Sequence, residues 1–191
     1  MKIIGITGTL GAGKGTIVDY LVSNKNFRHY SVRELLTRML EERGMELNRT
    51  NMVDLANDLR KEHGPSCIIE KLYEEAYSNQ LPCIIESIRT PGEVHALQAK
   101  NDFVLFAVNA DPELRYNRIL ERKSVTDHIS YEEFLANEAR EMKSDDPNKQ
   151  NISACIEMAD YRFLNNGTQK ELYDQIENTL NEINRNADSI K

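Results

Sequence analysis

Residues 4–16 of the chain read IGITGTLGAGKGT, a short apolar run followed by a glycine-rich turn, a lysine and a helix-like segment. Glycines at positions 8, 11, 13 and 15 allow positive φ angles, so the backbone N–H groups of the turn can point inward and touch phosphate oxygens. The N-terminus of the following helix adds partial positive charge at the same place. The order of strand, turn and helix predicts a P-loop rather than a turn that binds nothing, and therefore a bound nucleoside triphosphate.

The lysine and the hydroxyl of this motif indicate what it would hold. The spacing from Gly8 to Gly13 and Lys14 fits the P-loop, and Lys14 would reach the β- and γ-phosphates of ATP. Gly15 stands where a serine or threonine is usual, and the hydroxyl comes one position later, at Thr16. We therefore expect Mg²⁺ to be held mainly by ATP oxygens and waters, with Thr16 in its outer shell. The predicted nucleotide-binding residues of the loop are Gly8, Gly11, Ala12, Gly13, Lys14, Gly15 and Thr16.

The composition predicts one enzyme-sized domain over residues 1–191. A chain of 191 residues, of which 40% are hydrophobic, is long enough to bury one sizeable core. Its net charge of −7 argues against a general binder of nucleic acids or anionic membranes, whose surface would be basic. No apolar run approaches the roughly 20 residues that span a bilayer, and the sequence begins with a strand rather than a signal peptide. The three cysteines are scattered and form no zinc motif, so we expect a cytoplasmic protein without nucleic-acid or membrane partners.

Apolar runs separated by turn signals predict strands that alternate with helices. The strands are expected at residues 2–7, 27–30, 82–87, 103–109 and 160–164, and the helices at 14–24, 32–43, 52–63, 65–79, 91–100, 111–123, 131–143 and 168–184. Ser31 is the expected N-cap of the second helix, and Thr50 or Asn51 that of the third. The third and fourth strands are nearly continuous apolar runs, typical of a sheet covered on both faces. The pattern predicts an α/β P-loop NTPase fold with a five-stranded parallel sheet between two layers of helices.

This order of elements brings several polar segments to one edge of the predicted sheet. Ligands of parallel sheets bind beyond the carboxyl ends of the strands. These ends should carry residues 8–14, 31–33, 86–89, 109–111 and 165–168. Farther along the chain, two polar segments bracket the helix expected at 131–143. Residues 124–151 are therefore expected to form either a mobile lid or two ordinary surface loops around a helix.

Several arginines follow the strands at this edge. Arg33 comes after the second strand and Arg89 after the third, while Arg115, Arg118 and Arg122 share one face of the helix after the fourth strand. Phosphoryl transfer depends on positive charge placed around the oxygens of the moving group, and arginines can bind such oxygens with two hydrogen bonds. The alternative for the helical row is a solvated basic face paired with nearby glutamates. We predict that Arg118 and Arg122 act on the phosphates.

Glu86 ends the third strand and is the acid closest in sequence to the predicted phosphate site. It is a candidate for holding Mg²⁺ through water, or for pairing with Lys14 or Arg89, and both roles are compatible. The four histidines show no metal-binding spacing, and none of them adjoins a serine or cysteine in a nucleophile motif. Hydrolysis by a catalytic triad therefore has no support in the sequence.

Several of these segments resemble those of the adenylate kinase family. GTLGAGKGT, at residues 8–16, is similar to that family's P-loop, in which Gly-Thr after the lysine is normal. YSVRELL, at 30–36, resembles the acceptor-nucleotide segment, and IESIRT, at 85–90, resembles the family's Asp-Gly-Phe-Pro-Arg-Thr with Glu86 in place of the aspartate. RILER, at 118–122, is similar to the Arg-x₃-Arg at the start of the lid. The likeness spans nearly the whole chain and is greatest to adenylate-kinase-related P-loop proteins of archaea and bacteria.

The resemblance implies a division of the site into a donor side and an acceptor side. It implies that the helical segment 31–80 forms the acceptor side, and that Asn166 and Gly167 belong to the loop that packs on the donor adenine. The implied substrate-binding residues are Ser31, Arg33, Arg60 and Arg89, with a surface ion pair as the alternative role of Arg60. The implied catalytic residues are Lys14, Arg89, Arg118 and Arg122, and Thr16 and Glu86 would surround the metal.

Three functions follow from this sequence, and the first is favoured. It is an ATP-dependent kinase that transfers the γ-phosphate to a nucleoside or deoxynucleoside monophosphate, a small acceptor whose phosphate needs arginines but no general base. The second is a kinase of the dephospho-coenzyme A type, which needs a carboxylate near a hydroxyl acceptor, whereas residues 30–33 contain no acid. The third is a regulatory P-loop ATPase without an acceptor, against which the second set of cations, Arg33 and Arg89, argues. The sequence does not predict the acceptor base or the oligomeric state.

Overall fold

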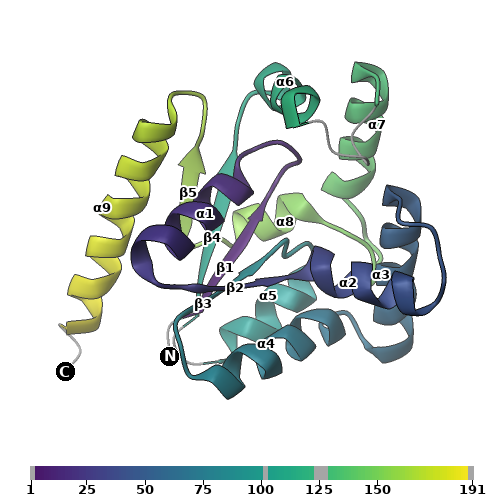
Figure 1. The fold of residues 1–191 in the computed structure, drawn as a ribbon, viewed down its shortest axis with the longest axis horizontal. Coiled ribbons are helices and arrows are strands. Elements are labelled where there is room, and N and C mark those ends of the chain that lie inside the picture. Colours follow the sequence, from purple (N-terminus) through teal and green to yellow (C-terminus); the bar gives the residue numbers. More distant parts are fainter. Residues whose placement is uncertain (1–2, 101–102, 123–128, 189–191) are drawn as a thin grey trace.

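The computed structural model describes residues 3–100, 103–122 and 129–188, and within them five parallel strands form one sheet (Figure 1). The strands lie in the order β2-β3-β1-β4-β5, so the strand that leads into the P-loop is central. Their bounds are β1 Ile3–Gly8, β2 Arg28–Ser31, β3 Cys83–Glu86, β4 Phe103–Asn109 and β5 Tyr161–Leu164. Each strand lies within one residue of its predicted position. The predicted α/β fold with a five-stranded parallel sheet is confirmed.

Helices cover both faces of this sheet (Figure 1). Their bounds are α1 Lys14–Lys25, α2 Val32–Glu42, α3 Arg49–His63, α4 Cys67–Asn79, α5 Pro91–Gln98, α6 Pro112–Arg122, α7 Tyr131–Met142, α8 Ile152–Glu157 and α9 Gln169–Asp188. Helices α1 and α9 pack together on one face, whereas α4, α5 and α8 lie against the other. None of the helices in the described part of the chain is long and apolar enough to cross a membrane.

Alternating residues of the buried strands supply two separate cores. In β3, Cys83 and Ile85 join the core under α2, α3, α4 and α5, while Ile84 joins the core under α1 and α9. Successive side chains of a strand point to opposite faces, so a strand covered on both sides is apolar throughout. The two cores fix the sheet between its helical layers and hold the carboxyl ends of β1 and β3 side by side, with Ile6 opposite Glu86.

The helix caps show where the expected boundaries were right and where they were wrong. Ser31 caps α2 as predicted, because its hydroxyl accepts a hydrogen bond from the backbone N–H of Glu34. Helix α3 starts earlier than expected, since its N-cap is Asn48, whose side chain accepts from the N–H of Asn51. The N-cap of α4 is Ser66, so that helix starts two residues after the predicted start. The earlier start of α3 places Arg49 inside that helix.

The region of the predicted lid is only partly described. Residues 124–128 of the expected segment 124–151 lie outside the described residues, as does the predicted end of α6 at 123. Helix α7 is packed onto α6, where the buried ring of Phe134 contacts Tyr116 and the guanidinium of Arg115. Helix α8, which the sequence pattern did not predict, begins after the intervening residues 143–151 and is capped by Asn151. Whether residues 124–151 move as a lid remains a prediction.

Candidate functional site

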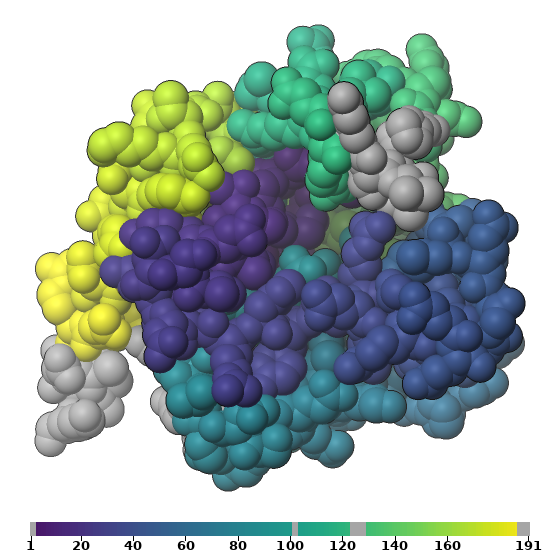
Figure 2. Space-filling view, viewed as in Figure 1, coloured from purple at the N-terminus to yellow at the C-terminus, as the bar shows by residue number. Residues whose placement is uncertain are grey.

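A cavity of about 740 Å³ opens at the carboxyl edge of the sheet. It is lined by the P-loop and the start of α1 on one side, by α2 and α3 on the other, and by residues of α6 and α7; the space-filling view shows the hollow between the N-terminal segment, α2 and α6 (Figure 2). The sequence-predicted residues that line it are Gly11, Gly13, Lys14, Gly15, Thr16, Arg33, Arg60, Glu86, Arg89, Arg118 and Arg122. The structure thus brings residues from five separate segments to one cavity, at the edge where parallel sheets bind ligands.

The P-loop backbone has the left-handed conformation that the glycines were expected to allow. Gly13 has φ of 107° at the N-cap of α1, and a Cβ atom at this position would lie 2.3 Å from Nδ2 of Asn165. At Gly15, by contrast, nothing lies within 4 Å of the place where a Cβ atom would be. The glycine at position 13 is therefore required by both conformation and space, whereas the glycine at position 15 is not.

Lys14 lies at the centre of the site. Its Nζ donates hydrogen bonds to the carbonyl oxygens of Gly8, at 2.9 Å, and Thr9, at 2.8 Å, so the ammonium group is folded back along the loop. Burial and then the neighbouring Arg89 guanidinium lower the pKa of Lys14 to about 7. A buried, poorly solvated ammonium gains strongly from an incoming anion, which suits a phosphate-binding role.

Five predicted site residues do not line the cavity, namely Gly8, Ala12, Ser31, Asn166 and Gly167. Gly8 packs against β4, where a Cβ atom would meet the Val108 carbonyl oxygen at 2.1 Å, and contributes its own carbonyl to Lys14. Ala12 is fully buried and its carbonyl accepts from Asn165. The Ser31 hydroxyl is already bonded to Glu34 and Glu86. Gly8, Ala12 and Ser31 therefore shape the site instead of facing it.

Asn166 and Gly167 border a second, shallower groove with Thr168 and the start of α9. The Asn166 side chain accepts a hydrogen bond from the backbone N–H of Asp111, at 2.9 Å, and so joins the loops after β4 and β5. The residue of this loop that contacts the P-loop is Asn165, whose Nδ2 donates to the Ala12 carbonyl at 2.9 Å. The adenine-binding role of Asn166 and Gly167 remains a prediction, and Asn165 was expected in this loop but not as its contact with the P-loop.

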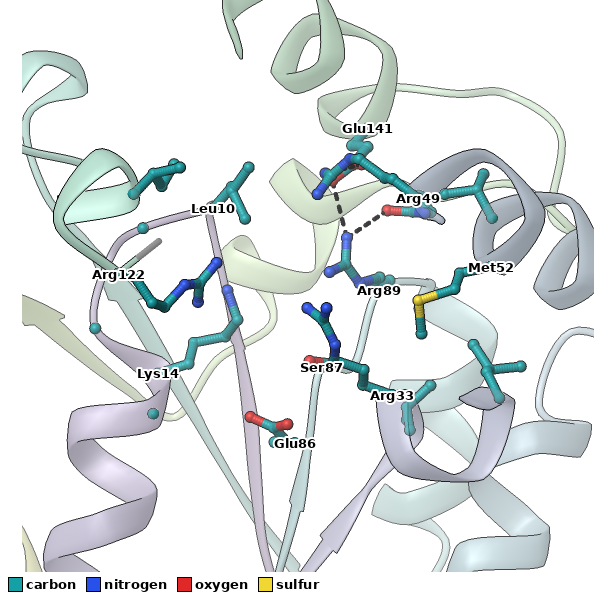
Figure 3. Close-up of a pocket in the computed structure, with 18 of the residues that line it drawn as sticks. Leu10, Lys14, Arg33, Arg49, Met52, Glu86, Ser87, Arg89, Arg122 and Glu141 are labelled. Atoms are coloured by element: carbon teal, nitrogen blue, oxygen red, sulfur yellow. Dashed lines mark hydrogen bonds and ion pairs between the residues drawn. The ribbon is translucent and has the colours of Figure 1, made fainter. Parts of the chain in front are cut away.

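Glu86 and Thr16 both line the cavity near Lys14, as Figure 3 shows for Glu86. The carboxylate of Glu86 accepts from the Ser31 hydroxyl at 3.1 Å and lies 3.6 Å from Nε2 of His29. Burial raises the pKa of Glu86, but His29, Lys14 and Ser31 outweigh it, and the net shift is downward. The carboxylate is therefore charged at neutral pH. The expected ion pair of Glu86 with Lys14 or Arg89 is not formed.

The described residues contain no group of three or more His, Cys, Asp or Glu side chains that would hold a metal by themselves. A Mg²⁺ ion here would accordingly depend on phosphate oxygens and waters, as its preference for retained waters allows. The hydroxyl of Thr16 and the charged carboxylate of Glu86 are oxygen donors in the cavity that fit such an outer shell. The glycine turn, the buried lysine and this pair of oxygen donors fit Mg·ATP, and their metal role remains a prediction.

The arginines of α6 have separate roles. Arg118 and Arg122 line the cavity, and Figure 3 shows Arg122 pointing toward Lys14. Arg115, one turn earlier, is buried and binds the carboxylate of Glu138 on α7, while its Nη1 also donates to the Leu10 carbonyl of the P-loop. The three arginines of α6 therefore form neither a solvated face nor a single ligand-binding row, because Arg115 joins α7 to the P-loop.

Arg60 differs from the expectation for a substrate-binding or surface arginine. Its side chain is 1% exposed, and Nε and Nη2 donate to Oε1 of Glu93 at 3.1 and 2.9 Å. Glu93 in turn accepts the backbone N–H groups of Arg89 and Thr90 through Oε2. Both donors of this buried ion pair bind the same carboxylate oxygen, while Nη1 of Arg60 is buried without a hydrogen-bond partner among the described residues and Arg60 lines the cavity, so its substrate-binding role stays a prediction. Its observed role is to hold the turn that carries Arg89.

That turn is backbone-strained at the mouth of the cavity. Ser87, directly after β3, has φ of 65°, an unusual value for a residue other than glycine. The following Ile88 is held by its N–H to the Ile6 carbonyl, at 3.1 Å, and by its own carbonyl, which accepts from the Thr7 hydroxyl at 2.7 Å. The bend redirects the chain so that Arg89 lies over the carboxyl ends of β1 and β3. Strain of this kind is concentrated at functional sites.

Arg89, which is predicted to lie on the acceptor side, and Arg49 contact residues that the sequence analysis missed. Arg89 Nη1 donates to Glu141 at 2.8 Å and to Gln150 at 2.7 Å, and Arg49 binds the other oxygen of Glu141. These partners are separated by 52 or more residues in sequence from Arg89 or Arg49. No local spacing signals such a contact. Figure 3 shows Arg33, Arg49, Arg89 and Glu141 gathered on the side of the cavity away from the P-loop.

Two archaeal proteins are similar in sequence to this chain over nearly its whole length. The chain is 29% identical over 98% of its length to a UPF0200 protein of Methanococcus vannielii, all of which is covered. It is also 29% identical over its whole length to UPF0200 protein MJ1399 of Methanocaldococcus jannaschii, of which 95% is covered. These relatives have no assigned activity in their names, so they establish a shared sequence type and not a substrate.

Solved structures share the fold. TT1252 from Thermus thermophilus matches with a TM-score of 0.64 and 22% identity, covering 95% of this chain and 97% of that one. Shikimate kinase from Bacteroides thetaiotaomicron matches with a TM-score of 0.58 and 12% identity, covering 96% and 98%. Dephospho-CoA kinase from Campylobacter jejuni matches with a TM-score of 0.53 and 14% identity, covering 95% and 97%. The specific resemblance to adenylate kinases is not among these matches. Because residues 4–144 match the AAA domain family, the chain belongs to that family and has the fold of P-loop kinases.

Proposed function

We propose that this protein is an ATP-dependent phosphotransferase that moves the γ-phosphate of ATP to a nucleoside or deoxynucleoside monophosphate. The observation that carries the proposal is the presence of two cationic groups at opposite sides of one cavity. Lys14 and Arg122 lie on the P-loop side, whereas Arg33 and Arg89 lie on the side of α2 and α3 (Figure 3), and Arg118 of α6 also lines the cavity. A protein that only bound or hydrolysed ATP would need the first group alone.

The walls between these groups are also informative. Val32 and Leu36 of α2 and Met52, Val53 and Ala56 of α3 give the acceptor side an apolar surface. Such a surface suits a planar base, while the arginines beside it suit a phosphate. A cavity of about 740 Å³ is also within the roughly 300–1,000 Å³ typical of small-molecule sites. These features support an acceptor with one apolar part and one anionic part.

The proposed chemistry needs positioning and charge more than proton transfer. The acceptor phosphate is ionised at neutral pH, so its oxygen can attack without a general base. Arg33 and Arg89 would orient it and offset its repulsion from ATP, while Lys14, Arg118 and Arg122 would stabilise charge on the γ-phosphate. When bound, Mg²⁺ would neutralise charge on the β- and γ-phosphates, and Thr16 and Glu86 would hold waters of its shell.

A kinase for a hydroxyl acceptor is the second candidate, and one contact favours it. The sequence offered no acid at residues 30–33, but β3 places the Glu86 carboxylate 3.1 Å from the Ser31 hydroxyl at the end of β2. This contact supplies a carboxylate near the end of β2, which supports a kinase with a hydroxyl acceptor. Its charged state at neutral pH is compatible with accepting a proton. The regulatory ATPase reading lacks a corresponding contact.

A substrate panel tests these alternatives directly. Purified protein with Mg·ATP would be assayed for ADP formation with each common nucleoside and deoxynucleoside monophosphate, with dephospho-coenzyme A, shikimate and gluconate, and with no acceptor. We expect stimulation by one or more monophosphates, and loss of turnover by orders of magnitude in Lys14→Ala, which removes a charge-assisted phosphate contact. Stimulation only by a hydroxyl acceptor would favour the second candidate. Acceptor-independent hydrolysis alone would favour the regulatory ATPase.

A further inference from the structure

Arg89 is held by Glu93, four residues later in the chain, and by two segments that are distant in sequence. Its backbone N–H donates to Oε2 of Glu93 at 2.7 Å, and its carbonyl accepts the N–H of Asn151 at 2.8 Å. Its Nη1 donates to both Glu141 and Gln150. A long side chain that would otherwise sample many rotamers is thereby fixed in one position. This degree of restraint exceeds what a solvent-exposed ion pair provides.

The carboxylate of Glu141 also restrains a second arginine on the same side of the cavity. Oε1 of Glu141, on α7, accepts from Nη2 of Arg49, which lies on α3. The Glu141 side chain is 5% exposed, whereas those of Arg49 and Arg89 are 20% and 23% exposed. Burial raises the pKa of Glu141, but Arg89 and Arg49 outweigh burial and the net shift is downward. A charged carboxylate therefore sits behind two guanidinium groups that reach the cavity.

The contacts leave one edge of Arg89 available. Only Nη1 is used by Glu141 and Gln150, and among the described residues Nε and Nη2 have no hydrogen-bond partner. The Nε–Nη2 edge of an arginine is one that can give two parallel hydrogen bonds to an oxyanion. In Figure 3 the Arg89 guanidinium lies between Glu141 and the cavity, near Arg33 and facing Lys14. Glu141 thus holds this arginine without covering its binding edge.

The local charge is also suited to an anion. Arg49 and Arg89 bring two positive charges and Glu141 one negative charge, which leaves a net positive charge among these three side chains. A phosphate oxyanion would be attracted to it. If Glu141 instead occupied the place of the ligand on Arg89, its carboxylate would be expected on the Nε–Nη2 edge of that arginine, whereas it binds Nη1.

We propose that Arg49 binds the anionic group of the acceptor together with Arg89, and that Glu141 is the positioning residue that aims both guanidinium groups. The assignment of the anion to an acceptor rests on the proposed function. The binding of an oxyanion at Arg49 and Arg89 does not, because it requires no turnover. Gln150 acts in the same way as Glu141 on Arg89, without a charge.

The test measures oxyanion binding separately from catalysis. Protein saturated with Mg²⁺ and a non-hydrolysable ATP analogue, which fills the P-loop phosphate sites, would be titrated with inorganic phosphate by calorimetry. We expect Arg49→Ala and Arg89→Ala each to weaken phosphate binding by about tenfold or more, since each removes charge-assisted hydrogen bonds. Glu141→Gln should weaken it by about three- to tenfold through loss of alignment, with unchanged affinity for the ATP analogue.

Matched variants separate positioning from the stability of α7. Glu138 is one turn earlier on α7 and binds Arg115, so Glu138→Gln loosens the same helix but leaves Arg49 and Arg89 paired. We expect Glu138→Gln to weaken phosphate binding less than Glu141→Gln does. Gln150→Met removes a contact of Arg89 without leaving a buried charge unpaired. Like Glu141→Gln, it should weaken phosphate binding. With any acceptor found in the panel, Glu141→Gln should raise the KM for the acceptor but not that for ATP.

The outcomes distinguish this inference from the proposed function. Tighter phosphate binding in Glu141→Gln would mean that the carboxylate competes with the ligand, and equal binding in Arg49→Ala would remove Arg49 from the site; either result overturns the inference. Equal losses in Glu138→Gln and Glu141→Gln, or no phosphate binding by the wild-type protein, would also overturn it. A panel without any monophosphate substrate, combined with the expected phosphate results, would instead contradict only the proposed substrate class.

Discussion

The side-chain amide of Asn165 occupies the space in which a Cβ atom on Gly13 would have to lie. The two residues belong to the loop after β5 and to the P-loop, and the distance from the ideal Cβ position to Nδ2 of Asn165 is 2.3 Å. Asn165 cannot simply retreat, because the same Nδ2 donates to the Ala12 carbonyl and the residue is 6% exposed. The P-loop therefore gets its shape partly from a residue about 150 positions away in the chain.

Gly13→Ala should accordingly damage nucleotide binding much more than Gly15→Ala. The first change adds a clash and strains a residue at φ of 107°, at a cost of about 1–3 kcal/mol for the backbone alone. The second adds a methyl group where nothing lies within 4 Å. Calorimetric titration with Mg·ATP and thermal unfolding of both variants would check this. Equal ATP affinity in the two alanine variants would contradict the role of Asn165 as a fixed wall.

ATP binding above pH 8 should take up nearly one proton. With a pKa of about 7 in the free protein, Lys14 is largely neutral at pH 8, and the incoming phosphates favour its charged form. ATP affinity should therefore fall as pH rises through 7, and proton uptake should be smaller at pH 6. Calorimetry in buffers of different ionisation enthalpy measures the uptake. Lys14→Arg is the control, since a guanidinium stays charged and no uptake should occur; uptake that persists there would assign the proton elsewhere.

Arg33→Ala and Arg89→Ala should cripple phosphoryl transfer with little change in ATP affinity. Both line the cavity on the side away from the P-loop, so their loss should lower kcat/KM for the acceptor by about 100-fold or more. Arg38→Ala is a matched control, because Arg38 is on the same helix as Arg33 but is exposed and pairs with Glu75. Steady-state kinetics and ATP titrations test this. Lost ATP binding with retained acceptor affinity would mean that donor and acceptor sides are reversed.

Removing one partner of the Arg60–Glu93 pair should destabilise the protein strongly. Both side chains are 1% exposed, so Arg60→Met leaves an uncompensated buried carboxylate at a cost of about 3–5 kcal/mol. The double variant Arg60→Met, Glu93→Gln should recover part of that loss. Urea unfolding measures both, and Lys170→Met, which breaks the exposed pair with Asp174, should change stability very little. No recovery in the double variant would indicate that Glu93 matters mainly through the backbone of Arg89 and Thr90.

The sequence predicted the sheet and the P-loop because both depend on local patterns. Apolar runs bounded by turns mark strands such as β4, and the glycine spacing marks the loop without reference to the rest of the chain. Helix α3 was less well placed, since Asn48, Thr50 and Asn51 are all competent caps and only the packing of the helix selects among them. Helix α8 has six residues, too few to show helical periodicity.

Site residues were predictable where they directly follow a strand or belong to a recognisable local motif. Arg33 and Arg89 follow strands directly, and the topology brings them to the cavity. Arg49 and Glu141 carry no such signal, because their pairing depends on how α3 and α7 meet across 92 residues of sequence. Arg60 lines the cavity, as its place in the segment 31–80 predicted, but its buried ion pair with Glu93 is a tertiary contact that no local spacing signals.

The two carboxylates of α7 make the helix a mechanical link between the two ends of the cavity. Glu138 is bound to Arg115, which contacts the P-loop, and Glu141 is bound to Arg49 and Arg89 on the far side. Any displacement of α7 as a rigid unit must alter both sets of contacts. A ligand that displaced α7 at one end would therefore change the affinity at the other end, and linkage requires the two ligands to affect each other by the same factor.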